Sequence, residues 1–268
     1  MARGPSLGSA VALASAALAA LVLVVWLAER PSPNRSRTGP THLPAATAPP
    51  DEGVAPPAVR LLEANTRDLT VAERPQTQLT GWAEAMSTEL NIPRAALEAY
   101  GYAARATEVS RPECNLNWPV LAGVGAVESG HGRFGGAELD ETARPSIPIR
   151  GIPLDGADGV RRIDDTDSGR LDGDEVFDRA VGPLQFIPET WNEWAVDADG
   201  DGFADPDDLD DAALAAAHYL CDSAGDLEDP DSFWDGVLTY NASRSYVQEV
   251  LDFADHYGKS SRSLQPEN

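Results

Sequence analysis

The sequence predicts a mainly α-helical domain over about residues 75–258. Apolar residues between Leu79 and Leu90 recur close to the 3.6-residue period of a helix. The segment 211–221 is rich in Ala and Leu, which favour helices, and few runs in the chain alternate or are β-branched. A hydrophobic fraction of 42% in 268 residues is enough for the core of one domain.

Six segments carry the helical pattern. The second has Pro93 in its first turn, where a missing N–H leaves no hydrogen bond unmade. The third begins at Trp118 and is expected to stop at Gly130 and Gly132, because glycine favours helix ends. Long loops are expected at 132–180 and 195–208. The expected helices are 79–90, 92–106, 118–129, 211–221, 233–240 and 245–257.

Residues 1–30 are predicted to form an uncleaved signal anchor, a transmembrane helix. Leu7 to Ala28 is a run of 22 uncharged residues, which as a helix would span about 33 Å, enough for the apolar core of a bilayer. Cleavage of this segment as a signal peptide, giving a secreted protein, is the alternative. Residues 31–74 are expected to form a Pro-rich linker and residues 259–268 a disordered tail.

Two cysteines, Cys114 and Cys221, fall within the predicted body. In an exported protein such a pair usually forms a disulfide. We therefore expect a Cys114–Cys221 bridge and an extracytoplasmic body that the N-terminal helix anchors to the cell membrane; two buried free thiols are the alternative. The formal net charge of −24 argues against a nucleic-acid-binding protein, which needs a basic face.

Glu128 is the only acid in the apolar stretch from Trp118 to Gly132. In the last turn of a mostly buried helix, its carboxyl would meet an apolar wall and the negative end of the helix dipole, and each raises a carboxyl pKa. A carboxyl that stays protonated near neutral pH can act as a general acid. Glu128 is thus the candidate catalytic residue. A helix-end glutamate that simply reaches solvent is the alternative.

Residues 197–208 match the twelve-residue EF-hand loop position by position. Acids stand at positions 1, 3, 5, 9 and 12, Gly202 allows the sharp turn, and Phe203 would offer its carbonyl oxygen. Position 12 is Asp208 instead of the usual glutamate, which shortens its reach. An acidic solvated turn is the alternative. The expected Ca²⁺ ligands are Asp197, Asp199, Asp201, Phe203, Asp205 and Asp208.

The calcium ion is expected to be structural, because its loop lies away in sequence from Glu128 and Gln185. Removing it should lower thermal stability more than it changes the chemistry. A second acidic stretch, 165–174, departs from the template after position 3 and is expected to be a surface turn cluster.

Three motifs, in order along the chain, resemble those of the lytic murein transglycosylases. The motifs are Glu128-Ser129, Gly182-x-x-Gln185-Phe186 and Tyr240-Asn241. The acidic loop between the second and third motifs is similar to the calcium loop of the B-type branch of that family. The resemblance covers about residues 75–258. Leu184 stands where the B-type branch often has Met, which conserves volume.

The resemblance implies a lysozyme-like, α-rich (α+β) catalytic domain that acts on peptidoglycan glycan strands. The family cleaves the β-1,4 bond between N-acetylmuramic acid and N-acetylglucosamine without adding water, and it leaves a 1,6-anhydromuramoyl end. By position, Glu128 would be the single catalytic acid and base. The residues expected to bind the strand or shape its cleft are Ser129, Gln185, Tyr240, Asn241 and Tyr246.

Two other functions remain open at this level. A hydrolytic muramidase on the same fold would need a second acid placed to activate water, and Glu138, Asp140 and Glu141 are candidates. A calcium-dependent wall-binding module would need no catalytic residue at all.

Overall fold

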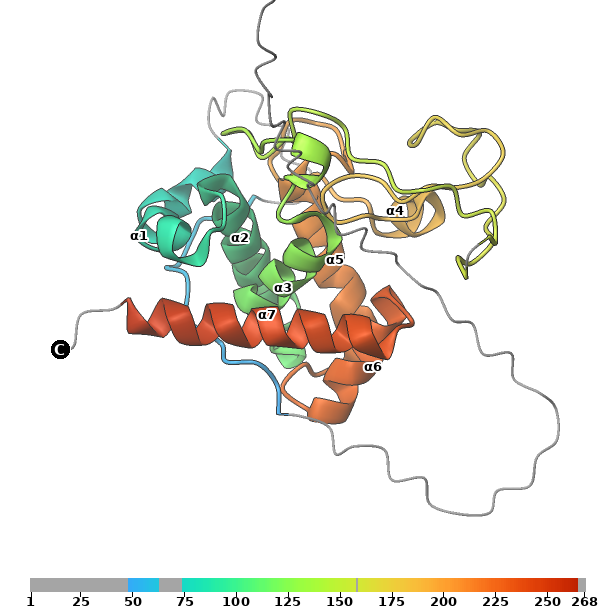
Figure 1. Cartoon of the computed structure of the whole chain (residues 1–268). Helices are drawn as coiled ribbons and strands as arrows, with labels where there is room; N and C mark the ends of the chain where they lie inside the picture. Colours follow the sequence, from blue (N-terminus) through green and yellow to red (C-terminus); the bar gives the residue numbers. More distant parts are fainter. Residues whose placement is uncertain (1–47, 63–73, 158, 265–268) are drawn as a thin grey trace, which may run out of the picture.

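The computed structural model describes residues 48–62, 74–157 and 159–264 (Figure 1). Within these ranges the chain is helix-rich and has isolated β-bridges in place of a sheet, so the α-rich class is confirmed. No helix among the described residues is long and apolar enough to cross a membrane. The predicted signal anchor and residues 31–47 and 63–73 of the predicted linker lie outside the described residues.

All six expected helices are present, and a seventh, α4, occupies a segment for which none was expected. Each of α3, α4 and α6 has a proline in its first turn. In chain order the elements are η1 (Pro75–Leu79), α1 (Thr80–Leu90), α2 (Arg94–Ser110), η2 (Pro112–Cys114), α3 (Trp118–Ser129), η3 (Phe134–Gly136), α4 (Pro188–Trp194), α5 (Leu209–Ala224), α6 (Pro230–Tyr240) and α7 (Arg244–Ser263).

Helix α3 is the central element of the core. It packs against α2 and along α7, which crosses it in Figure 1. Its residues from Trp118 to Gly125 are all buried, as befits a helix that is apolar on every side. The close approach of α7 requires Gly123, since a Cβ there would lie 2.6 Å from the carbonyl oxygen of Val250. The loops between α3 and α5 gather at one end of the helices, around α4 (Figure 1).

Residues 48–62 lie against the helices, although this part of the chain was expected to belong to a linker without packing. The carbonyl oxygen of Val54 accepts hydrogen bonds from the indole N–H of Trp118 at 3.0 Å and of Trp82 at 3.3 Å. The Val54 amide donates to the hydroxyl of Ser261 at 3.0 Å. Backbone atoms make these contacts, so they leave no periodic side-chain pattern in the sequence.

Helix α7 continues to Ser263, whereas the helix was expected to end at 257 and a disordered tail to begin at 259. Gly258 and Ser261 are buried. A Cβ on Gly258 would overlap the backbone of Asp51. The segment around Asp51 and Val54 therefore covers the last turns of α7, and this packing extends the helix beyond the sequence-based boundary.

The predicted disulfide is confirmed. Cys114 in η2 and Cys221 in α5 are bridged, with their Cα atoms 5.4 Å apart. The bridge ties the connection between α2 and α3 to α5, which lies 107 residues further along the chain.

Replacing both cysteines by alanine is expected to lower the free energy of unfolding by about 3–5 kcal/mol, because the bridge closes a long loop in the unfolded chain. Urea unfolding of the parent and the double variant measures the difference. A reductant should lower the melting temperature of the parent and leave that of the double variant unchanged. Two free thiols in the exported protein, found by mass spectrometry, would contradict the bridge.

Candidate active site

Local sequence places Glu128 in the last turn of α3, as predicted. At the start of the helix, the Asn117 side chain caps by accepting from the Val120 amide. At its end, Gly130 takes a left-handed conformation with φ 60°, and its amide bonds to the Ala126 carbonyl. The helix therefore ends at Ser129, one residue after Glu128, with Gly130 as its C-cap.

The protein encloses the Glu128 carboxyl closely, yet the residue stays partly open to a cavity of about 350 Å³. Burial raises its pKa to about 7. The hydroxyl of Tyr246 on α7 donates to Glu128 Oε1 at 2.6 Å, which favours the ionised form and lowers the pKa in part. The result is a carboxyl that changes charge near neutral pH.

Residues from five parts of the chain line this cavity: the end of α3, the loop 151–161, the segment 180–190, α5, and the end of α6 with the two residues after it. Glu128 is the one carboxylate among the lining residues that the structure describes. Glu138, Asp140 and Glu141 lie in an exposed loop and do not line it. The lining residues are Glu128, Gly151, Ile152, Leu154, Val160, Arg161, Ala180, Gln185, Phe186, Ile187, Thr190, Tyr219, Leu238, Thr239, Tyr240, Asn241 and Ala242.

A tight hairpin from Val181 to Phe186 forms one wall of the cavity. Its two end residues exchange backbone hydrogen bonds of 2.8 and 3.0 Å. Gln185 has a φ of 52°, which few residues with a Cβ adopt. Its side-chain amide donates to the Gly182 carbonyl at 2.9 Å, which ties the side chain back to the turn.

Side chains from two other elements hold this hairpin. The hydroxyl of Ser129 donates to the Pro183 carbonyl at 2.6 Å, and that of Tyr240 donates to the Leu184 carbonyl at 2.8 Å. Tyr240 also lines the cavity. Ser129 is buried beneath it, and neither Ser129 nor Tyr246 is part of the lining. The structure thus places these two predicted site residues as supports for the hairpin and for Glu128.

Asn241 lies in the cavity wall with an extended backbone, φ −145°. It is only 5% exposed, and its side-chain oxygen has no hydrogen-bond partner among the described residues. An unpaired buried acceptor is unfavourable. A ligand that brings an N–H or O–H donor would relieve this cost.

Sequence reasoning missed Tyr219 and the loop residues 151–161. The ring of Tyr219 lies 5.6 Å from that of Tyr240, and the two tyrosines form an aromatic wall of the cavity. Trp194, 5.8 Å from Tyr219, packs against this wall and does not line the cavity. A tyrosine in an Ala-rich helix was a signal that could have been used. The loop residues carry no periodic pattern, so the sequence offered no comparable signal for them.

The acidic loop between α4 and α5 gathers three carboxylates whose oxygens lie within 4.8 Å of one another: Asp197, Asp199 and Asp211. Asp211 was not among the expected ligands. Asp208, expected at position 12, instead caps α5 and faces Arg144 at 3.1 Å. The reason is that α5 begins directly after Asp208. On its first turn Asp210 pairs with Arg74, whereas Asp211 faces the acidic loop and accepts a hydrogen bond from the Ala198 amide at 2.7 Å.

The other expected ligands are placed differently. Asp205 and Asp201 face the guanidinium of Arg144, which supplies a positive charge on that side of the loop. The Phe203 side chain is exposed. Burial, with the nearby charges of Asp208 and Asp199, raises the pKa of Asp211 to about 9, and burial raises that of Asp199. A bound cation would stabilise both ionised carboxylates, so the donor set fits one.

This loop packs directly against the hairpin, although it is separate in sequence from Glu128 and Gln185. A Cβ on Gly182 would overlap the carbonyl oxygen of Pro206, so only glycine fits there. Arg150, whose backbone pairs with Val181, holds Asp207 through two hydrogen bonds of 2.6 and 2.7 Å. The position of the acidic loop and that of the hairpin that carries Gln185 are therefore linked by direct contacts.

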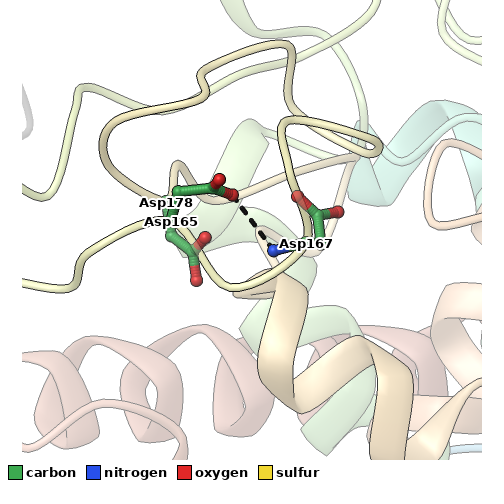
Figure 2. Close-up of side chains that lie close together, drawn as sticks. All are labelled: Asp165, Asp167 and Asp178. Carbon is green, nitrogen blue, oxygen red and sulfur yellow. Dashed lines mark hydrogen bonds between the residues drawn. The ribbon is translucent and has the colours of Figure 1, made fainter.

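The second acidic stretch also brings three carboxylates together, from Asp165, Asp167 and Asp178 (Figure 2). Thr166 donates twice to Asp178, and the Asp167 amide donates to Asp165 at 3.0 Å. These hydrogen bonds order the turn, just as backbone amides that donate to Asp197 and Asp211 order the first acidic loop.

Part of the chain matches a known domain family. Residues 177–225 match the Transglycosylase SLT domain family. The matched segment contains the hairpin, α4, the acidic loop and the whole of α5, and it stops short of Tyr240. No curated protein matched the chain, and no solved structure did. The match supports a lytic transglycosylase family and, in general terms, an enzyme acting on peptidoglycan.

Replacing Tyr246 by phenylalanine is expected to raise the pKa of Glu128 above about 7, because the hydrogen bond that favours the carboxylate is lost. Carbon-13 NMR titration of the Glu128 carboxyl measures it directly. Tyr257→Phe is the matched control, since that hydroxyl bonds to His131 at 3.0 Å. A Glu128 pKa that is equal in parent and Tyr246→Phe would contradict the role given to Tyr246.

Proposed function

We propose that this chain is a peptidoglycan lytic transglycosylase that cleaves the β-1,4 bond between N-acetylmuramic acid and N-acetylglucosamine and leaves 1,6-anhydromuramoyl ends. One observation carries the proposal: Glu128, with a pKa of about 7, is the one carboxylate among the described residues that line the cavity. Hydrolytic glycosidases use two carboxylates. The family match over 177–225 supports the same class of enzyme.

In the first step, protonated Glu128 donates its proton to the glycosidic oxygen, and the bond from that oxygen to C1 of the muramoyl unit breaks. The N-acetylglucosamine portion leaves with a neutral hydroxyl. The acetamido carbonyl of the muramoyl unit stabilises the positive charge at C1. Tyr246 then donates its hydrogen bond to the carboxylate that remains on Glu128.

In the second step, ionised Glu128 takes the proton from the C6 hydroxyl of the same muramoyl unit. The C6 oxygen bonds to C1 and closes the 1,6-anhydro ring. Glu128 is protonated again, so acid and base work are done by one residue and no water is consumed. A pKa near the working pH suits a group that must both give and take a proton.

The other lining residues bind the strand. Asn241 offers its unpaired side-chain oxygen to a sugar N–H or O–H, and Gln185 and Tyr240 present polar edges from the hairpin and the end of α6. Tyr219 adds an aromatic face on which a sugar ring can pack. Ser129 and Tyr246 keep the hairpin and Glu128 in position.

The acidic loop is proposed to hold a structural Ca²⁺ through Asp197, Asp199 and Asp211. Three carboxylate oxygens within reach of one another, two of them on groups whose pKa is raised, support this assignment. The ion would supply positive charge that stiffens the loop behind the hairpin.

The body is proposed to be extracytoplasmic and anchored to the cell membrane by the N-terminal segment. The Cys114–Cys221 disulfide supports an oxidising compartment, and the substrate class lies outside the cytoplasm. The uncharged run from Leu7 to Ala28 supports the anchor.

Replacing Glu128 by glutamine is expected to slow release of soluble muropeptides from peptidoglycan at least 1,000-fold, on the order of the loss of an essential general acid and base. In the parent, the rate should fall as pH rises through about 7, because a smaller fraction of Glu128 is then protonated. Glu189→Gln, an exposed acid outside the cavity lining, is the control. A Glu128→Gln variant as fast as the parent would contradict the catalytic role of Glu128, whereas a parent that binds peptidoglycan and releases no muropeptides would favour a wall-binding module.

Ca²⁺ at about 10 mM is expected to stabilise the protein by about 1.4–2.7 kcal/mol, for a dissociation constant of roughly 10⁻³ to 10⁻⁴ M. A chelator should remove this effect and also slow turnover, because the loop supports the hairpin. Asp211→Asn should abolish the response, whereas Asp235→Asn, an exposed acid on α6, should keep it. Melting curves with and without chelator that coincide for the parent would argue against a bound ion.

A further inference from the structure

One cationic side chain lines the cavity among the described residues, that of Arg161. It belongs to the loop that also supplies Ile152, Leu154 and Val160 to the lining. Acids outnumber lysines and arginines by 44 to 20 in this chain, and the net charge is −24. The positive charge of Arg161 at the cavity is therefore opposite in sign to the net charge of the chain.

Arg161 makes no hydrogen bond or ion pair with any described residue, although it is exposed in a strongly acidic chain. The next residue behaves differently. Arg162 donates to Asp164 at 2.6 Å and lies over the ring of Phe177, 5.0 Å from its centre. Two adjacent arginines thus have separate roles: Arg162 fastens the loop, and Arg161 leaves its five N–H donors available at the cavity.

The Arg161 charge acts on the aromatic wall. Burial and the charge of Glu193 raise the pKa of the Tyr219 phenol, and the charge of Arg161 opposes them. Arg161 and Tyr219 line the same cavity, and the ring of Tyr219 is 5.6 Å from that of Tyr240. Glu193 does not line the cavity and forms no ion pair with Arg161. Arg161 thus shares the cavity lining with the tyrosines on which the strand would pack.

We propose that Arg161 binds a carboxylate on the lactyl arm of the muramoyl unit and makes the enzyme selective for anionic glycan strands. This inference rests on the proposed function and defines its substrate further. The lactyl arm distinguishes N-acetylmuramic acid from N-acetylglucosamine. It ends either in its own carboxylate or in a peptide that carries carboxylates. A planar guanidinium matches a carboxylate in geometry and charge, and a lysine would match it less well.

The remaining lining of the loop suits such an arm. Ile152, Leu154 and Val160 offer apolar surface to the methyl groups of a lactyl unit or of alanine side chains. The charge and the apolar surface come from one short loop, so a single loop would recognise the substituent while Glu128 acts on the sugar ring.

The test uses the full chain and three substrates: strands with intact peptides, strands from which an amidase has removed the peptides, and strands whose carboxyls have been converted to methylamides. Release of soluble muropeptides gives kcat/KM on each. Arg161→Gln is expected to lower kcat/KM about threefold to tenfold on carboxylate-bearing strands, mainly through KM, as for a solvent-accessible charge pair. On the methylamide strands Arg161→Gln and the parent should be equal. Arg162→Gln is the matched control and should not discriminate among the substrates.

Comparison of the three substrates identifies which carboxylate Arg161 binds. A loss confined to peptide-bearing strands assigns it to the peptide, and a loss on peptide-free strands assigns it to the lactyl group. Binding of the same strands to Glu128→Gln, with and without Arg161→Gln, measures recognition apart from turnover. An equal loss on methylamide strands, or no loss on either carboxylate-bearing strand, would overturn the role of Arg161. A parent that is inactive on all three substrates would instead overturn the proposed function. In that case, the strand binding of Glu128→Gln with and without Arg161→Gln still tests whether Arg161 recognises a carboxylate.

Discussion

The geometry of the cavity depends on how the Val181–Phe186 hairpin is held. Hydroxyl groups from the ends of α3 and α6 donate to two of its carbonyls, at 2.6 Å from Ser129 and 2.8 Å from Tyr240. Behind it, Gly182 packs against the acidic loop with no room for a side chain. Three segments far apart in sequence thus fix one turn. The same turn allows Gln185 its unusual left-handed backbone, since the surrounding contacts offset the strain.

The surroundings of the Glu128 carboxyl set its pKa. Enclosure by the protein raises the pKa of Glu128 to about 7, and the Tyr246 hydroxyl limits that rise. Both protonation states are therefore accessible near neutral pH, and the hydrogen bond stabilises the ionised one when it forms. The described lining offers no second carboxylate to activate water. Together these features favour attack by a hydroxyl that the substrate itself carries.

Six of the seven α-helices in the described residues could be predicted from local causes, such as the apolar period in α1, Pro93 before α2 and Gly130 at the end of α3. The short helix α4 was not predicted. The disulfide and the pKa of Glu128 followed from similarly local features. The parts that could not be predicted depend on tertiary contacts. Residues 48–62 pack through backbone atoms such as the Val54 carbonyl. The choice of Asp211 over Asp208 follows from where α5 begins. Arg161 lines the cavity because of the path its loop takes in the fold. The residues next to it in sequence form no pattern that would predict this position.

The mass of the muropeptides that the parent enzyme releases tests most directly whether Glu128 acts alone as acid and base. Ring closure consumes no water, whereas hydrolysis adds one water to each cleaved bond. Strands digested to completion and analysed by mass spectrometry should yield muramoyl ends one water lighter than reducing ends. Products that carry the extra water, and that can be reduced by borohydride, would show that water is the nucleophile and would contradict the one-carboxylate mechanism.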